Sequence, residues 1–201
     1  DSLVVSISTH TDSTHDVSCK YICDGLITVN VTGGAPNYNQ LGNPVYMYLW
    51  NDILEQTTAT AIGLCVDSLA NNITYKCVIT DAQGCQDSIE YVLSQPDELI
   101  VIPSLTTDIS CNGDADGALI ADSITGGNGG ITWIWNNGTT TATNTNLVTG
   151  TYVILVTDAK GCKDTAEIYL PEPDVLVDVV TITDLNCFED ASGEINAVAS
   201  G

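Results

Sequence analysis

The chain repeats itself, and this internal repetition constrains its fold more than any other feature. The segment TDAQGCQDSIEYVLSQPDELIV at 80–101 recurs as TDAKGCKDTAEIYLPEPDVLVD at 157–178. One period is 77 residues, measured from Asp97 to Asp174, whereas the first copy spans 96 because it carries loop insertions. Self-similarity at a fixed period predicts an array of like units. We expect a first repeat at 1–96, a second at 97–173 and a partial third at 174–201, as an excerpt of a longer array.

The pattern within one repeat is that of short strands. Apolar and polar residues alternate in Ile131–Asn136, which places Trp133 and Trp135 on one side, and again in Thr151–Asp158. Thr139–Val148 reads as a pair of polar strands, and Gly-rich turns separate the segments. We therefore predict an all-β fold of tandem immunoglobulin-like (PKD-like) β-sandwich repeats. An all-β domain of another topology is the alternative.

Charge excludes several function classes. The 201 residues hold 26 Asp and Glu against four Lys and no Arg, for a formal net charge of -22. Nucleic acids and anionic membranes both require clustered Lys and Arg, so neither is an expected partner. The chain is not expected to be disordered, because 44% of its residues are apolar. No apolar run approaches the length of a membrane span.

The motifs of the repeat resemble a known family. They are CNGDADG at 111–117, a Gly-Gly turn, WIWN at 133–136, GTYVILVTDAKGC at 150–162 and PEPD at 171–174. Together they are similar to the SprB-type repeat of cell-surface adhesins in gliding Bacteroidetes. The resemblance covers essentially the whole chain and is closest in the second copy. It implies export by the type IX secretion system, long extracellular filaments, and adhesion to surfaces or polysaccharides.

An Asp followed by Ser or Thr and a small or aliphatic residue occurs six times. This pattern is similar to the O-glycosylation acceptor sequence of Bacteroidetes surface proteins, where sugars would be bulky and solubilising. The alternative is the ordinary alternation of polar and apolar residues in strands. The candidate acceptors are Ser2, Ser13, Ser68, Ser88, Ser123 and Thr165.

Eight cysteines in an acidic β-rich chain favour an oxidising, extracellular setting. Cys111 precedes strand B of the immunoglobulin order and Cys162 follows strand F, and these strands run in the same direction. The two residues would then stand at opposite ends of one sandwich, about 26 Å apart, whereas a disulfide needs Cα atoms within about 7 Å. If repeats stack end to end, the F–G turn of one repeat approaches the A–B turn of the repeat before it, so we expect a bond between neighbouring repeats, from Cys19 to Cys162. A bond within one repeat of different topology is the alternative.

The remaining cysteines follow from the same scheme. Cys85 and Cys111 would reach partners in flanking repeats, and Cys187 is the equivalent of Cys19 in the third copy. Cys23, Cys65 and Cys77 occur only in the first copy, so we expect one local bridge among them and one odd thiol.

Few other residues suggest a ligand or a reaction. Asp114 and Asp116 in the loop NGDADG alternate like the start of a calcium loop, but the distant bidentate Glu is absent, and an Asx-type turn is the favoured interpretation. No other cofactor is expected. His10 and His15 lie in an insertion that the other copies lack. Because sites are rarely built on the variable part of a repeat, we do not expect an enzyme.

The sequence thus predicts a structural repeat segment of a long extracellular adhesin filament. Its partners would be neighbouring repeats of the same chain, other filament subunits, and surface polysaccharide. The alternative is a carbohydrate-binding module in which Trp50, Trp133 and Trp135 stack on sugar rings.

Overall fold

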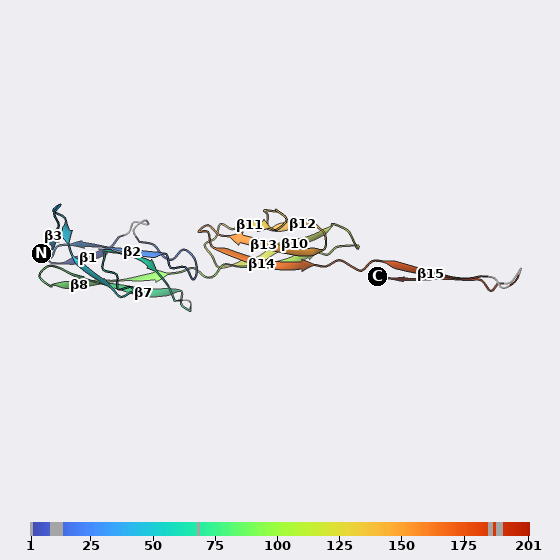
Figure 1. Cartoon of the computed structure of the whole chain (residues 1–201), viewed down its shortest axis with the longest axis horizontal. Coiled ribbons are helices and arrows are strands. Elements are labelled where there is room, and N and C mark those ends of the chain that lie inside the picture. Colours follow the sequence, from blue (N-terminus) through green and yellow to red (C-terminus); the bar gives the residue numbers. More distant parts are fainter. Residues whose placement is uncertain (1, 9–13, 68, 185–186, 188–190) are drawn as a thin grey trace. The chain divides into compact units, whose positions relative to one another are not determined.

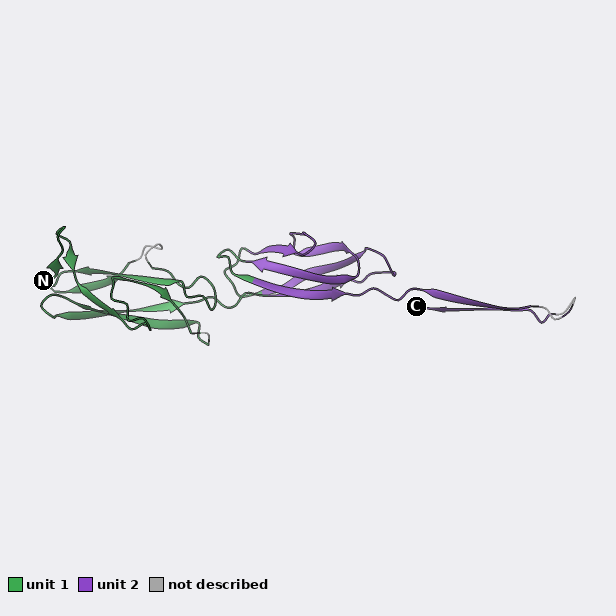
Figure 2. Cartoon of the chain, in the orientation of Figure 1, with its two compact units in different colours: residues 1–100, 125–130, 158–163 green, residues 101–124, 131–157, 164–201 purple. Residues whose placement is uncertain are grey.

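The computed structural model describes residues 2–8, 14–67, 69–184, 187 and 191–201. Regular structure in these ranges consists of sixteen β-strands, and no helix occurs in them, so none there could span a membrane (Figure 1). The chain forms two compact units (Figure 2). The first comprises residues 1–100, 125–130 and 158–163, and the second comprises 101–124, 131–157 and 164–201. The repeat boundaries at 96 and 173 stay a prediction.

The first unit contains a sandwich of two antiparallel three-stranded sheets. One sheet has the order β1-β2-β6 and the other has the order β5-β7-β8. A small hairpin is inserted between β2 and β5. The strands are β1 (Val4–Ile7), β2 (Gly25–Thr32), β5 (Met47–Trp50), β6 (Thr60–Leu64), β7 (Asn72–Thr80) and β8 (Gln86–Ser94), and the hairpin is β3 (Asn37–Tyr38) with β4 (Pro44–Val45).

The next six strands repeat the same order. Their sheets are β12-β10-β9 and β11-β13-β14. In both sets the first, second and fourth main strands form one sheet and the third, fifth and sixth form the other, which is the immunoglobulin pattern of A, B and E against C, F and G. The immunoglobulin-like expectation is therefore confirmed. The strands are β9 (Ile100–Thr107), β10 (Gly117–Thr125), β11 (Thr132–Trp135), β12 (Thr143–Leu147), β13 (Gly150–Thr157) and β14 (Lys163–Leu170).

A tryptophan from strand C lies in the core of each sandwich. Trp50 is 2% exposed and Trp135 is 1% exposed. Each indole Nε1 donates a hydrogen bond to a backbone carbonyl, of Thr58 at 2.9 Å and of Thr141 at 3.0 Å respectively. The buried polar group is thereby satisfied while the ring fills the space between the sheets.

The two sandwiches also share a buried tyrosine near the start of strand F. The Tyr75 hydroxyl donates to the carbonyl of Cys65 at 2.7 Å, and the Tyr152 hydroxyl donates to that of Val148 at 3.0 Å. This is the tyrosine corner of immunoglobulin-like sandwiches, in which the hydroxyl bonds back to the chain just upstream. The two copies therefore fold by the same set of interactions.

One expected strand pair is wrong. Thr139–Val148 holds a single strand, β12, because the residues before it form a turn instead. At the start of the range the Thr139 N–H donates to Asn137 Oδ1 at 3.2 Å, and the Thr139 hydroxyl donates to Asn144 Oδ1 at 3.0 Å. Amide side chains that bond locally compete with a strand ladder, and here they prevail.

The last two strands form a hairpin that stands uncovered. β15 (Val177–Thr183) and β16 (Glu194–Ser200) pair along their whole length, yet all their side chains are exposed. Their positions correspond to strands A and B of the preceding copies. The second sheet that covers such a pair in the earlier copies is absent from the described residues here, so apolar groups such as Ile182 and Ile195 face solvent.

The two tryptophans of strand C in the second sandwich provide a matched test of the core. Trp133 is half-buried, and its buried Nε1 has no hydrogen-bond partner among the described residues. Trp135→Phe should lower the free energy of unfolding by about 1–3 kcal/mol, because it leaves the Thr141 carbonyl unsatisfied. Trp133→Phe should cost less than about 1 kcal/mol, because it removes a group that already lacks a partner. Urea unfolding measures both, and equal losses would contradict this assignment.

Candidate functional site: cysteine loops and hairpin turns

Each copy presents a cysteine on a loop before strand B, here named the first cysteine loop (residues 17–24) and the second cysteine loop (residues 109–116). In both, the N–H of the serine before the cysteine donates to an aspartate, from Ser18 to Asp24 Oδ1 at 2.9 Å and from Ser110 to Asp116 Oδ1 at 3.1 Å. A backbone turn starting at each cysteine carbonyl completes the loop. The two loops therefore hold their cysteines by the same local hydrogen bonds.

In each copy, a side chain just after strand G accepts a hydrogen bond from a backbone N–H of the cysteine loop. The N–H of Tyr21 donates to Gln95 Oε1 at 3.3 Å, and the N–H of Gly113 donates to Glu172 Oε2 at 2.8 Å. Tyr21 and Gly113 have φ angles of 67° and 85°, a region that favours glycine. The tyrosine adopts it nonetheless, and its hydroxyl donates to Glu98 at 3.3 Å.

The F–G connections carry the other half of the site, here named the first hairpin turn (residues 81–85) and the second hairpin turn (residues 158–162). Asp158 Oδ1 accepts hydrogen bonds from the N–H groups of Lys160 and Cys162, and its Oδ2 accepts one from Asn128 N at 2.7 Å. Asp81 accepts the equivalent bonds from Gln83, Cys85 and Ala35. Each carboxylate therefore ties its hairpin turn to the Gly-Gly segment that follows strand B.

These hydrogen bonds lower the pKa of both carboxylates. For Asp81, the bond from the Ala35 N–H is the main cause that lowers the pKa below its usual range. For Asp158, burial acts to raise the pKa, but the bonds from Asn128, Cys162 and Lys160 outweigh it, and the pKa is lowered. A carboxylate that accepts several backbone N–H bonds is stabilised in its charged form.

The structure joins the first cysteine loop to the second hairpin turn. Cys19 and Cys162 form a disulfide with their Cα atoms 5.6 Å apart, the pairing that the strand order led us to expect. Asn128 supports the contact, because its Nδ2 donates to the Ser18 carbonyl at 2.9 Å and to Asp158 Oδ2 at 2.8 Å. All these residues belong to the first compact unit.

The other cysteines divide into bonded, buried and exposed groups. Cys23 and Cys65 form a second disulfide with Cα atoms 4.3 Å apart. Cys77 is buried between the sheets as a free thiol, and burial raises its pKa to about 11. The local bridge and the odd thiol that the sequence led us to expect in the first copy are therefore present. Three exposed cysteines are free thiols, namely Cys85, Cys111 and Cys187.

The acidic residues of the second cysteine loop bond to that loop itself. The hydroxyl of Ser110 donates to Asp116 Oδ2 at 2.6 Å and to Asp114 Oδ2 at 3.2 Å. The bonds from Ser110 lower the pKa of Asp116 below its usual value. In the described ranges no group of three or more His, Cys, Asp or Glu is arranged to hold a metal ion. Asp116 thus performs the structural role of Asp24, and the calcium alternative stays untested.

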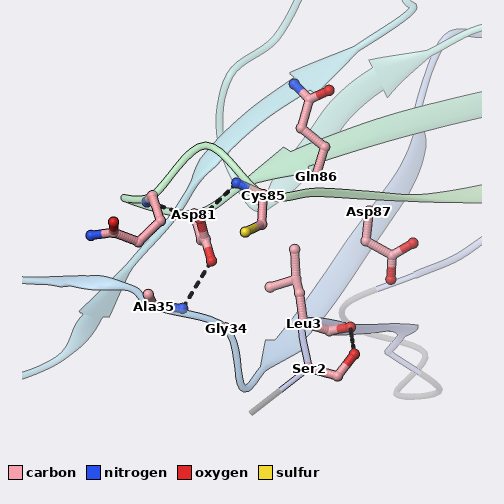
Figure 3. Close-up of a pocket in the computed structure, with 9 residues that line it drawn as sticks. Ser2, Leu3, Gly34, Ala35, Asp81, Cys85, Gln86 and Asp87 are labelled. Atoms are coloured by element: carbon pink, nitrogen blue, oxygen red, sulfur yellow. Dashed lines mark hydrogen bonds between the residues drawn. The ribbon is translucent and has the colours of Figure 1, made fainter.

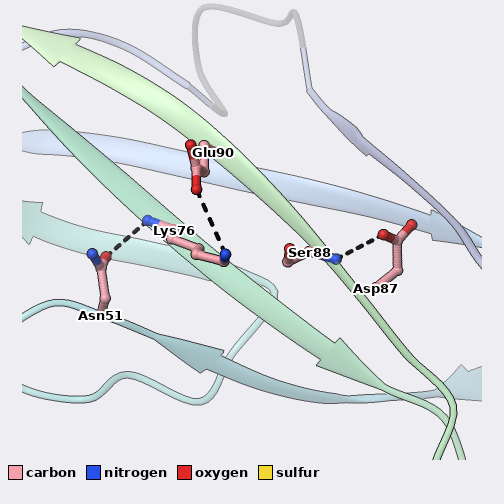
Figure 4. Close-up of polar contacts among 5 residues, drawn as sticks. All are labelled: Asn51, Lys76, Asp87, Ser88 and Glu90. Atoms are coloured by element: carbon pink, nitrogen blue, oxygen red, sulfur yellow. Dashed lines mark hydrogen bonds and ion pairs between the residues drawn. The ribbon is translucent and has the colours of Figure 1, made fainter.

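Four of the six candidate glycosylation residues are exposed, namely Ser2, Ser88, Ser123 and Thr165. Ser88 lies on β8, where its N–H donates to Asp87 Oδ1 at 2.8 Å (Figure 4). Close by, Lys76 Nζ lies 3.6 Å from Glu90 in an exposed ion pair. Ser13 and Ser68 lie outside the described residues, as does His10, while His15 is exposed.

The exposed free cysteines and the buried Cys77 should differ in how fast they react with an alkylating reagent. With iodoacetamide at mildly alkaline pH, Cys85, Cys111 and Cys187 should react within the ordinary time of an exposed thiol, because the thiolate is the reactive form. Cys77 should react at least tenfold more slowly until the protein is unfolded, because its raised pKa suppresses the thiolate. Peptide mass spectrometry at successive times measures this, and equal labelling of Cys77 and Cys85 in the native protein would contradict it.

The lowered pKa of Asp158 predicts a pH dependence. Its charged form stabilises the folded state fully above the unfolded pKa of about 3.9, and this contribution is lost as the pH falls through the folded pKa. Asp158→Asn should therefore be less stable than the wild type near pH 7, and the gap should narrow below about pH 4. Urea unfolding at a series of pH values measures the gap. A gap that stays constant into acid would show that the charge of Asp158 contributes nothing.

Comparison with known proteins gives one family match and several distant structures. A search of curated proteins finds no match. A fragment of intimin, solved with the intimin-binding domain of its receptor Tir, aligns over 90% of this chain and 67% of its own, with 13% identity and a TM-score of 0.43. A tetra-tandem repeat from the extending region of a large adhesion protein aligns over 98% of this chain and 62% of its own, with 13% identity and a TM-score of 0.25.

The family match falls in the second sandwich. Residues 104–140, from β9 through β11 to the turn after it, match the family model described as the SprB repeat. The chain therefore carries, at residues 104–140, a segment that matches the family which its sequence motifs resemble.

Proposed function

We propose that the chain is a structural repeat segment of a long extracellular, cell-surface adhesin filament of the gliding-motility type. The SprB repeat match supports this proposal, as do two sandwiches with the same strand order. Export by the type IX secretion system and adhesion to surfaces or polysaccharides belong to the same proposal, and their support is the SprB resemblance. A net charge of -22 favours solubility of such a segment.

The observation that carries the proposal is that the Cys19–Cys162 disulfide joins two positions far apart in the sequence. Cys19 and Cys162 are 143 residues apart in sequence. Tension applied to the two ends of the chain therefore passes from Cys19 directly to Cys162. Every strand from β2 to β13 lies between them and cannot be pulled out while the bond is intact. This is the behaviour that a load-bearing spacer requires.

The alternative of a carbohydrate-binding module is less well supported. Trp50 and Trp135 are buried in the cores with their indole N–H groups bonded to backbone carbonyls. Their ring faces do not reach solvent, where a sugar could stack. The exposed acceptors Ser2, Ser88, Ser123 and Thr165 would instead carry O-linked sugars on the outside of the filament.

Single-molecule stretching tests the load path. Pulled by its ends under oxidising conditions, the chain should lack about 500 Å of extension that appears after reduction, because each fully extended residue spans about 3.3–3.6 Å. The double variant Cys19→Ser with Cys162→Ser should recover about 350 Å of this extension without reductant, because the intact Cys23–Cys65 bond still shields 42 residues. The double variant Cys23→Ser with Cys65→Ser should still lack the whole of it, because Cys19–Cys162 encloses that segment. The same extension before and after reduction would refute the load path.

Antibody labelling tests the location. Antibodies raised against the chain should label intact cells of the source organism, and brief surface proteolysis should remove the label. Labelling that appears only after permeabilisation would contradict a place on the cell surface, whatever the stretching experiment shows.

A further inference from the structure

An open cavity lies beside the exposed thiol of Cys85. It has a volume of about 570 Å³ and is formed within the first unit by the chain start, the Gly-Gly segment and the first hairpin turn (Figure 3). Figure 3 shows the sulfur of Cys85 near the Asp81 carboxylate and the Leu3 side chain. The residues that line the cavity are Ser2, Leu3, Gly34, Ala35, Asp81, Gln83, Cys85, Gln86 and Asp87.

This cavity corresponds residue by residue to the surroundings of Cys162. A Cβ added to Gly34 would lie 3.0 Å from Asp81 Oδ2 and 3.0 Å from Leu3 Cδ1. A Cβ added to Gly127 would meet Asp158 Oδ2 and Leu99 Cδ1 at the same two distances. The hydrogen bonds of the two hairpin turns are also the same. The two sites are therefore copies of one structure.

The copies differ in what fills them. Around Cys162 the first cysteine loop is in place, joined by the disulfide and by the bond from Asn128 to Ser18, and Leu99 is 6% exposed. Around Cys85 no described residue takes the place of that loop, and the cavity stays open to solvent. The filled copy shows which kind of group the open copy is shaped to receive.

The second cysteine loop supplies such a group. It is held by Asp116 and Glu172 as the first loop is held by Asp24 and Gln95, and its Cys111 thiol is exposed. A cavity of about 310 Å³ lies beside it. Leu176, which takes the position of Leu99 in the next copy, is 75% exposed. The Cys111 thiol and the Leu176 side chain are therefore both accessible to solvent.

We propose that the cavity at Cys85 is a docking site for the second cysteine loop of another copy of this repeat, and that Cys85 and Cys111 then form a disulfide. Two thiols lose two protons and two electrons, and a small-molecule disulfide such as oxidised glutathione takes them up to become two thiols. The inference deepens the proposed function, because head-to-tail bonds of this kind would extend the shielded load path beyond one pair of repeats.

Disulfide mapping of the full chain tests the docking. The variant Cys187→Ser leaves Cys85 and Cys111 as its exposed free thiols in the described part of the chain. At high protein concentration in a buffer of reduced and oxidised glutathione, Cys85–Cys111 cross-links between copies should exceed each homotypic cross-link by at least about tenfold. The proposal would be overturned if the yields of the Cys85–Cys85, Cys111–Cys111 and Cys85–Cys111 cross-links matched those of random pairing between the two thiols.

A gain-of-contact variant sharpens the test. Ala35 stands where Asn128 stands in the filled copy, so Ala35→Asn should add the bond to the serine carbonyl and raise the Cys85–Cys111 yield about two- to tenfold. Ala82→Asn adds the same side chain at an exposed position that does not line the cavity, and should change nothing. Equal yields from both variants would contradict docking at this cavity. Surface labelling and stretching are unaffected by that outcome, so this inference can fail while the proposed function stands.

Discussion

The structure depends on one geometric constraint, which is the parallel course of strands B and F. A cysteine before strand B and a cysteine after strand F stand at opposite ends of their own sandwich, separated by strands of eight or nine residues in the second copy. Such strands span about 26–30 Å, whereas a disulfide requires Cα atoms within about 7 Å. The observed bond from Cys19 to Cys162 satisfies the constraint by joining residues from different repeats.

Because of this constraint, the Cys19–Cys162 disulfide does more than stabilise the fold: it also determines which part of the chain bears tension. Closing a loop of this length lowers the entropy of the unfolded chain and is worth about 5 kcal/mol in the chain-entropy model. The position of the bond matters more than this energy, because it removes twelve strands, β2 to β13, from the path of tension. Asn128 and the ionised Asp158 hold the two loops in register for the bond. The residues that position the Cys19–Cys162 disulfide are therefore also the residues on which the load path depends.

Much of the fold could be predicted from the sequence, because the repeat and the alternation around Trp135 and Tyr152 report directly on strands and cores. The Cys19–Cys162 pairing followed from the strand order, which excludes a bond within one repeat, together with the expectation that neighbouring repeats stack end to end. What could not be predicted rests on single side-chain contacts. Nothing in the spacing indicates that Gln95 and Glu172 hold the cysteine loops, or that Tyr21 adopts a glycine-like φ. The same limit explains why Thr139–Val148 is predicted as two strands and holds one, since Thr139 bonds locally to Asn137 and Asn144.

Mapping of the native disulfides by digestion without reductant tests the central constraint most directly. The account predicts a linked peptide pair containing Cys19 and Cys162, which separates on reduction, and a second pair containing Cys23 and Cys65. A peptide pair joining Cys111 to Cys162, or Cys19 to Cys85, would place both cysteines at one end of a single sandwich. Either result would contradict the strand order and with it the load path.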